Sequence, residues 1–172
     1  MDEVDRIVAA WRRERPDLDL GPLEVLSRVT RLARHLDRAR SAAFARHELV
    51  TWEFDVLAAL RRAGSPYQLS AGQLVGQTMV TSGTMTNRID RLAARGLVRR
   101  LPDPADGRGV MVRLEDRGRL LADAALADLL QIESGVLVVL DQNEHKQLSM
   151  LLRDLLTTFD RPESDPRLGP IR

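Results

Sequence analysis

The spacing of apolar residues predicts a chain built mainly from helices. Apolar side chains recur every three or four positions along most of the sequence, which is the period of an amphipathic helix. Stretches rich in Gly, Pro, Asp or Asn interrupt this period and separate the helices from one another. The predicted helices cover residues 2–13, 23–47, 51–64, 71–78, 82–96, 115–140 and 142–159.

One segment departs from the helical period and predicts a short β-hairpin. Residues 97–101 and 110–114 bring together β-branched and apolar side chains, as half-buried strands do. The sequence PDPADGRG between them has the composition of a turn. The hairpin directly follows the helix 82–96, and the order short helix, turn, helix and wing is that of a winged helix-turn-helix. The predicted fold class is therefore mainly α with a small β-wing.

Capping residues mark the two helices of this unit. Ser70 precedes the short helix 71–78, and Thr81 or Ser82 precedes the helix that ends at Gly96. Hydroxyl side chains at such positions accept hydrogen bonds from the first free backbone N–H groups of a helix. Glycine is favoured just beyond a helix end because it adopts the left-handed conformation without strain. We therefore expect two separate helices with well-defined starts.

The helix 82–96 has one apolar face and one small polar face. Met85, Ile89 and Leu92 lie at i, i+4 and i+7, and we expect them to point inward. At about 100° per residue, the opposite side carries hydroxyls, a glycine and an amide, which let a helix approach base edges and phosphates closely. The candidate DNA-binding residues are Ser82, Gly83, Thr84, Thr86, Asn87 and Arg91, together with Arg108 at the tip of the wing for the minor groove.

Local charge favours DNA binding, although the whole chain is nearly neutral. The formal net charge is +1, whereas residues 81–101 contain five Arg and one Asp. An Arg-rich helix also occurs as a plain solvated surface, and Arg108 also fits a purely structural turn. The hairpin, the caps and the small polar turn together favour the DNA-binding interpretation. A winged-helix protein that binds only other proteins is the alternative.

The composition argues against catalysis and thiol chemistry. The chain has no Cys, which excludes disulfides and thiol sensing. Its three histidines, His35, His47 and His145, lie far apart in the sequence, and neither a P-loop nor a GxSxG motif occurs. We therefore expect no enzyme, no catalytic or metal-binding residues and no cofactor. We find no signal peptide and no apolar run of the ~20 residues that a membrane span needs, so we expect a cytoplasmic protein without a membrane partner.

The last two predicted helices carry apolar residues on more than one face, which predicts a homodimer. Helices of this kind must be buried on several sides, and a symmetric partner is the simplest way to cover them. Burial within a single chain is the alternative. The expected organisation is an extra N-terminal helix at 1–14, dimerisation helices at 22–50 and 115–160, a winged helix-turn-helix region at 51–114, and a disordered tail at 161–172.

From about Leu23 to Phe159, the sequence resembles the MarR family of bacterial regulators. The most specific features are TNRIDRL, then GLV, and then the DxxDxR pattern of Asp103, Asp106 and Arg108. The resemblance implies a homodimer whose N- and C-terminal helices interlock. It also implies a palindromic double-stranded DNA operator with each wing in a minor groove, and an anionic or phenolic ligand that relieves repression.

The sequence also resembles a narrower MarR subgroup, which has an extra N-terminal helix and responds to urate or to tricarboxylates. That subgroup has a Trp on the extra helix, an Asp near the start of the helix before the reading unit, an Arg in the recognition helix and an Arg on the first wing strand. The positions that match are Trp11, Asp55, Arg88 and Arg100. The resemblance implies that these residues bind a small anionic effector such as urate, citrate or trans-aconitate.

The position of Arg88 on its helix is consistent with a ligand contact. It lies about 60° from the inward axis, where its guanidinium could hold a planar carboxylate through two hydrogen bonds. We expect Asp55 to pair with Arg100, so that an anion arriving near Asp55 strains this link and shifts the recognition helices. The alternatives are that Trp11 belongs to the core, that Asp55 forms a purely structural ion pair, and that Arg88 binds a phosphate.

Overall fold

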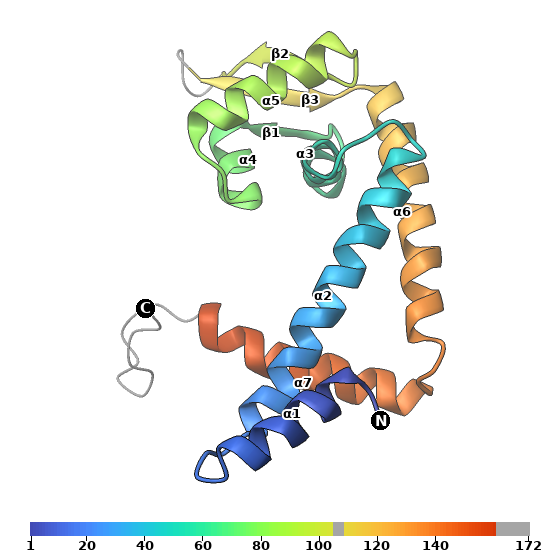
Figure 1. Cartoon of the computed structure of the whole chain (residues 1–172). Coiled ribbons are helices and arrows are strands. Elements are labelled where there is room, and N and C mark those ends of the chain that lie inside the picture. The colour runs from blue at the N-terminus through green and yellow to red at the C-terminus, as the bar shows by residue number, and fades with distance from the viewer. Residues whose placement is uncertain (105–108, 161–172) are drawn as a thin grey trace. The chain divides into compact units, whose positions relative to one another are not determined.

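The computed structural model describes residues 1–104 and 109–160, which form two compact units divided at Ile132 and Glu133 (Figure 1). The predicted wing-tip residue Arg108 and the predicted disordered tail 161–172 lie outside the described residues. The elements are α1 (Glu3–Glu14), α2 (Gly21–Ala45), α3 (Thr51–Arg62), β1 (Gln68–Ser70), α4 (Ala71–Thr78), α5 (Ser82–Ala94), β2 (Val98–Pro102), β3 (Val110–Leu114), α6 (Asp116–Leu137) and α7 (Gln142–Asp160).

The helical period located each predicted helix, and the ends differ by a few residues. The helix α2 begins two residues before Leu23, because Pro22 fits the first turn of a helix, where its missing N–H has no partner to lose. The helix α6 ends at Leu137 instead of continuing to residue 140, and a turn precedes α7. The prediction of a mainly helical chain is confirmed.

The sheet has three strands, whereas the sequence predicted two. The strand β1 pairs antiparallel with β3, which also pairs antiparallel with β2, so the order is β1-β3-β2. Leu69 of β1 lies opposite Val112 of β3, and both side chains are buried. The two-stranded prediction was incomplete because a strand of three residues is too short to display an alternating pattern.

The core of the first unit lies between the sheet and the helices that surround it. Buried residues of α3, α4, α5 and the sheet pack together, and the end of α2 joins them through Phe44, whose ring stacks on Phe54 with centroids 4.1 Å apart. The first part of α6 adds Ala122, Ala125 and Leu129. The core therefore holds α5 against the sheet on one side and leaves its other side free.

The start of α6 packs very closely against the chain that follows α5. A Cβ built on Gly118 would lie 2.2 Å from the carbonyl oxygen of Leu97, so only glycine fits there. The same carbonyl accepts a hydrogen bond from the backbone N–H of Glu115 at 3.0 Å. This close approach fixes the end of α5 relative to α6.

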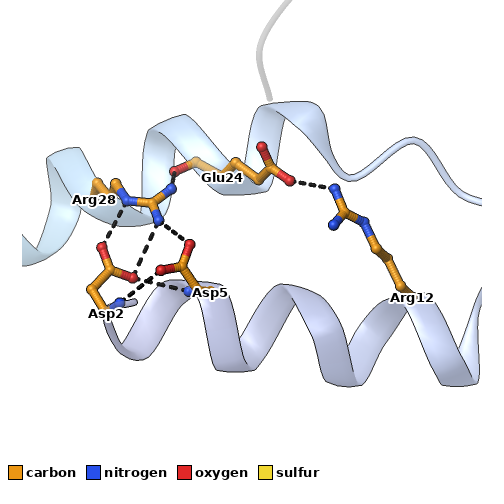
Figure 2. A network of polar contacts seen from close by, with 5 residues as sticks. All are labelled: Asp2, Asp5, Arg12, Glu24 and Arg28. Atoms are coloured by element: carbon orange, nitrogen blue, oxygen red, sulfur yellow. Dashed lines mark hydrogen bonds and ion pairs between the residues drawn. The ribbon is translucent and has the colours of Figure 1, made fainter.

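The helix α1 lies along the N-terminal half of α2, and ion pairs join the two helices (Figure 2). The guanidinium of Arg28 donates to Asp2 at 2.8 Å and to Asp5 at 2.6 Å, and Arg12 donates to Glu24 at 2.5 Å. Hydrogen bonds from Arg28 and from the backbone N–H of Asp5 lower the pKa of Asp2, and hydrogen bonds from the backbone N–H of Asp2 and from Arg28 lower the pKa of Asp5. Val4 and Val8 of α1 are buried as well, so the extra N-terminal helix is docked by apolar side chains together with these exposed ion pairs.

Candidate DNA-reading surface and anion recess

The start of α5 is defined by a hydroxyl cap. The N–H of Thr84 donates to Oγ1 of Thr81 at 3.3 Å, and the two threonine hydroxyls are 2.9 Å apart. Of the two caps that the sequence allowed, Thr81 is therefore the one used. Ser70 caps α4 as predicted, since its hydroxyl accepts from the N–H of Gln73 and the amide of Gln73 accepts from the N–H of Ser70.

The two faces of α5 lie as the sequence predicted. Met85, Ile89 and Leu92 are buried in the core. Arg88 is half-buried, at the boundary between the two faces. The open face carries all the described members of the candidate DNA-binding set, which are exposed: Ser82, Gly83, Thr84, Thr86, Asn87 and Arg91.

Ion pairs neutralise much of the positive charge around α5. Arg95 pairs with Glu53 at 2.8 Å, Arg99 with Glu115 at 3.0 Å, and Arg100 with Asp90 at 2.5 Å. Arg88 and Arg91 form no ion pair with any other residue that the structure describes. Three of the five Arg residues in 81–101 are therefore paired with a carboxylate, and a count of Arg residues alone overstates the charge available to a nucleic acid.

Arg88 and Arg91 both lie against one aromatic ring. The guanidinium carbon of Arg88 is 5.2 Å from the centroid of the Trp52 ring, and that of Arg91 is 5.0 Å away. Both distances are within the range of cation–π attraction. Trp52 was not among the site residues predicted from the sequence. The sequence feature that could have indicated it is a matching spacing. Trp52 and Asp55 are three residues apart on α3, and Arg88 and Arg91 are three residues apart on α5.

These residues line a recess at the surface of α5. Its volume is about 460 Å³, and its walls are Trp52, Gly83, Thr84, Asn87, Arg88 and Arg91. Small-molecule sites fall in this size range. The recess combines an aromatic wall, two cations and hydroxyl and amide groups, which is the chemistry that suits a small planar anion or a phosphate.

Asp55 lies next to this recess, but it is not paired with Arg100 as we predicted. Its carboxylate is 3.7 Å from the guanidinium of Arg40 on α2. Burial raises the pKa of Asp55, and Arg40, Arg88 and Arg62 oppose that rise electrostatically. Arg100 pairs instead with Asp90, because these two residues stand on the directly connected elements α5 and β2. The predicted Asp55–Arg100 pair was therefore wrong.

Trp11 lies far from Asp55 within one chain. It is 49% exposed and lines a separate recess of about 520 Å³ with Leu18, Leu23 and Leu26, among others. Arg40, which contacts Asp55, stands 14 residues beyond Leu26 on the same helix, which is roughly 20 Å at 1.5 Å per residue. Of the four candidate ligand residues, the structure therefore brings together only Asp55 and Arg88.

Glu53 is a second residue that the sequence analysis missed. It is only 4% exposed, and its carboxylate accepts from Nη1 of Arg95 at 2.8 Å and from the N–H of Val50 at 3.1 Å. Nη2 of Arg95 donates to the carbonyl of Glu48 at 2.9 Å. Arg95 directly follows α5 and Glu53 lies in the first turn of α3, so this cluster ties the two helices together.

Two helices are joined by a turn, and the second helix is exposed along a small polar face. A small antiparallel sheet follows. This arrangement defines a winged helix-turn-helix protein of the DNA-binding class. Residues 49–109 match the model of the MarR family. The transcriptional regulator PecS of Dickeya dadantii is 39% identical over 150 residues, which cover 87% of this chain and 90% of PecS. The chain belongs to the MarR family of DNA-binding transcription regulators.

Solved structures agree with this assignment. The chain is similar to a mutant of Escherichia coli MarR complexed with operator DNA, with a TM-score of 0.66 and 25% identity over 85% of this chain and 97% of that one. It is also similar to Bordetella bronchiseptica BpsR, with a TM-score of 0.58 and 31% identity over 74% and 98% of the two chains. The BpsR structure is described as a mechanism for regulation of DNA binding by 6-hydroxynicotinic acid. Within the described residues, no helix is long and apolar enough to cross a membrane.

Proposed function

We propose that this protein is a homodimeric repressor that binds a palindromic operator through α5 and the wing, and that a small anionic metabolite releases it. The observation that carries the proposal is the exposed N-terminal turn of α5. That turn presents free N–H groups, small hydroxyls and, one to two turns further, two cations without a carboxylate partner among the described residues.

The contacts with DNA are assigned from the exposed face of α5. Gly83 has no atom within 4 Å of the place where a Cβ would stand, so nothing inside the protein requires a glycine there. A glycine does keep the surface low enough for a close approach to a groove. Thr84, Asn87 and Arg91 surround it and supply hydrogen-bond donors and acceptors for base edges and phosphates. Arg108 completes the proposed set in the wing.

The proposed dimer covers apolar surface that a single chain leaves open. On α2, Val25 is 53% and Leu26 is 55% exposed, and Val29 and Leu32 are exposed on the same helix. On α7, none of the side chains at 142–159 is buried. Apolar surface of this kind marks a protein–protein interface, and a two-fold symmetric partner is the commonest occupant. The exposed large apolar residues of α7 are Met150, Leu151, Leu152, Leu155, Leu156 and Phe159.

The proposed effector binds in the recess beside Arg88. A guanidinium against an aromatic ring can bind a planar carboxylate through two hydrogen bonds, and Trp52 offers a flat surface for stacking. Urate, citrate and trans-aconitate are therefore the first candidates, and the ligand named for BpsR, 6-hydroxynicotinic acid, is also a small acid. Because Trp11 lies roughly 20 Å along α2 from the contact with Asp55, it contributes to this site only from the second copy of a dimer.

A gel mobility-shift assay with the DNA upstream of the protein's own gene tests DNA binding. We expect specific binding whose affinity falls steeply with salt, because phosphate contacts release counterions. Arg91→Ala should weaken binding at every salt concentration. The matched control is Arg15→Ala, which removes an exposed Arg from the loop after α1. Absence of binding even at low salt would favour the protein-interaction alternative.

A thermal-shift screen with urate, citrate and trans-aconitate tests the effector. A ligand that binds only the folded protein raises the apparent melting temperature. The active compound should also release DNA in the mobility-shift assay. We expect Arg88→Ala and Asp55→Asn to change that release, and unchanged release in both variants would rule out this recess as the effector site.

A further inference from the structure

We propose that Trp52 is a positioning residue that holds Arg88 and Arg91 as one unit and thereby couples the anion recess to the DNA-reading face of α5. The inference rests on the proposed function, because it concerns how the effector site acts on DNA binding. It goes further in assigning the coupling to Trp52, a wall of the recess that is not among the residues assigned to DNA.

The geometry begins with two helical spacings that face each other. Trp52 and Asp55 stand three residues apart on α3, so they share one side of that helix. Arg88 and Arg91 stand three residues apart on α5 and also share a side. Both guanidiniums lie over the ring of Trp52, at 5.2 and 5.0 Å from its centroid. Asp55 is close enough to Arg88 for electrostatic attraction between them.

The ring is the principal partner of both cations. Neither Arg88 nor Arg91 has a carboxylate partner within the described parts of the chain, whereas Arg95, Arg99 and Arg100 each have one. An exposed cation–π contact corresponds to about a two- to fivefold change in an equilibrium constant. Trp offers the strongest such contact of the aromatic side chains. Loss of the ring therefore releases both side chains at once.

A bound anion acts on Arg91 through this shared ring. An anion that pairs with Arg88 draws its guanidinium away from Trp52 or moves the ring with it, and Arg91 then loses part of its support. Arg91 is exposed on the face that we assign to DNA, so its altered position weakens the operator complex. By thermodynamic reciprocity, DNA held by Arg91 weakens the anion at Arg88 by the same factor.

A double-mutant cycle on operator affinity tests the coupling. We compare the wild type, Trp52→Leu, Arg91→Ala and the double variant, using the salt conditions of the mobility-shift assay. Trp52→Leu should weaken DNA binding by about two- to fivefold, and Trp52→Phe by less, because a smaller ring remains. The fold loss of DNA affinity caused by Arg91→Ala should be about three times smaller in the Trp52→Leu protein than in the wild type. The effects of two independent substitutions on affinity multiply to within roughly twofold. A double variant whose DNA affinity matches the product of the two single effects within that range would therefore overturn the proposal.

Tryptophan fluorescence gives a readout that a merely structural role of Trp52 would not move. The chain has two Trp residues, so in a Trp11→Phe protein the emission comes from Trp52 alone. Titration with citrate or urate should change this emission, and Arg88→Ala should abolish the change. Emission that responds equally with and without Arg88, or that does not respond while the anion still releases DNA, would contradict the proposal. The DNA affinity of the Trp11→Phe protein is measured as the reference for this series.

The outcomes separate this inference from the proposed function. If the wild type shows no salt-dependent DNA binding, the proposed function fails. If it binds DNA and the cycle is additive, only the coupling role of Trp52 fails. If Trp52→Leu lowers the melting temperature too far for a binding assay, the same cycle is run with Trp52→Phe, and the fluorescence titration decides the result.

Discussion

The two ends of α5 differ sharply in how they are held. At the N-terminal end, only the Thr81 hydroxyl caps the helix, and the side chains around it are exposed. At the C-terminal end, the N–H of Gly96 donates to Ala93 at 2.9 Å and that of Leu97 to Leu92 at 3.0 Å, which is a Schellman motif. The Glu53–Arg95 cluster and the contact of Gly118 with Leu97 add to this anchor. The helix is thus fixed where it ends and free where it meets a ligand.

This difference indicates a division of labour within one helix. The anchored end sets the direction in which the helix leaves the core, and its groups are already satisfied by the protein. The open end keeps its donors for DNA. The residues of α5 that line the recess run from Gly83 in the open first turn to Arg91 in the last turn, so a change at the recess reaches both parts of the helix.

The largest expected effect comes from disturbing the anchored end at Gly118. Gly118→Ala places a Cβ 2.2 Å from the Leu97 carbonyl, so backbone must move, and we expect a loss of about 3 kcal/mol in the free energy of unfolding. Urea denaturation measures this. The control is Gly135→Ala in the same helix, where no atom lies within 4 Å and alanine is the better helix former. Equal stability of the two variants would show that the close contact does not constrain the fold.

A smaller loss is expected from the buried carboxylate at this end. Glu53→Ala removes the hydrogen bonds to Arg95 and to the N–H of Val50, which should lower the free energy of unfolding by about 2 kcal/mol. DNA affinity should fall as well, because the end of α5 is no longer tied to α3. Thermal denaturation and the mobility-shift assay measure the two effects. Arg119→Ala, which removes a pair with the highly exposed Asp116, is the control and should change little.

On the exposed face of α5, substitutions should change binding without changing stability. Arg91→Ala is expected to weaken operator binding by about tenfold and to reduce the salt dependence by roughly one phosphate contact. Its melting temperature should stay within about 1 °C of the wild type, because Arg91 is exposed. Arg99→Ala is a matched comparison, since that Arg is engaged by Glu115. A stability loss in the Arg91 variant as large as that of Glu53→Ala would remove the distinction between the exposed face of α5 and the groups that anchor the helix.

The smallest expected effect is a pH dependence of anion binding at the recess. Burial raises the pKa of Asp55 above its ordinary value of 3.8, despite the opposing charges of Arg40, Arg88 and Arg62. As the pH falls toward this raised pKa, Asp55 becomes neutral and no longer repels an anion, so anion affinity should rise. Calorimetric titration of the wild type and of Asp55→Asn at pH 7 and at successively lower pH measures the trend, and the comparison at each pH cancels the protonation of the ligand itself. A wild-type affinity that does not rise relative to that of Asp55→Asn as the pH is lowered would contradict the assignment.

The same shift has a consequence for stability. Because the folded-state pKa of Asp55 is raised, its contribution to folding is fully present below pH 3.8 and is lost as the pH rises through the raised value. At neutral pH, Asp55 therefore carries a burial cost. Asp55→Asn should not lower the melting temperature there, which separates its role at the recess from a role in the core.

The sequence predicted the fold well wherever the deciding partners are close in the chain. The cap of α4 was predicted because Ser70 and Gln73 are three residues apart. The two faces of α5 were predicted because helical geometry alone separates Met85 from Gly83. The DNA-binding set on α5 rests on the same periodicity, and the structure exposes each of its described members. The assignment of these residues to DNA stays a prediction.

The ligand site was harder to predict because its residues come from separate elements. The four matched positions fall into three places: Asp55 and Arg88 lie together, Arg100 is paired with Asp90, and Trp11 of α1 lines a recess with the N-terminal part of α2. Pairing between charged residues depends on which surfaces meet, and the chain contains many Arg and Asp residues of equal chemical suitability. No local pattern distinguishes Asp90 from Asp55 as the partner of Arg100.

By itself, the amino-acid sequence determined the order of the helices, the hydroxyl caps, the buried and open sides of α5 and the family of the protein. The family rests on the resemblance along residues 23–159, whereas the other features depend on residues within a few positions of one another, where backbone geometry decides which groups meet. Only the tertiary structure decided that β1 joins the sheet, that Glu53 binds Arg95 and that the ring of Trp52 contacts both Arg88 and Arg91. These contacts join elements separated by tens of residues, so they form only when the core packs.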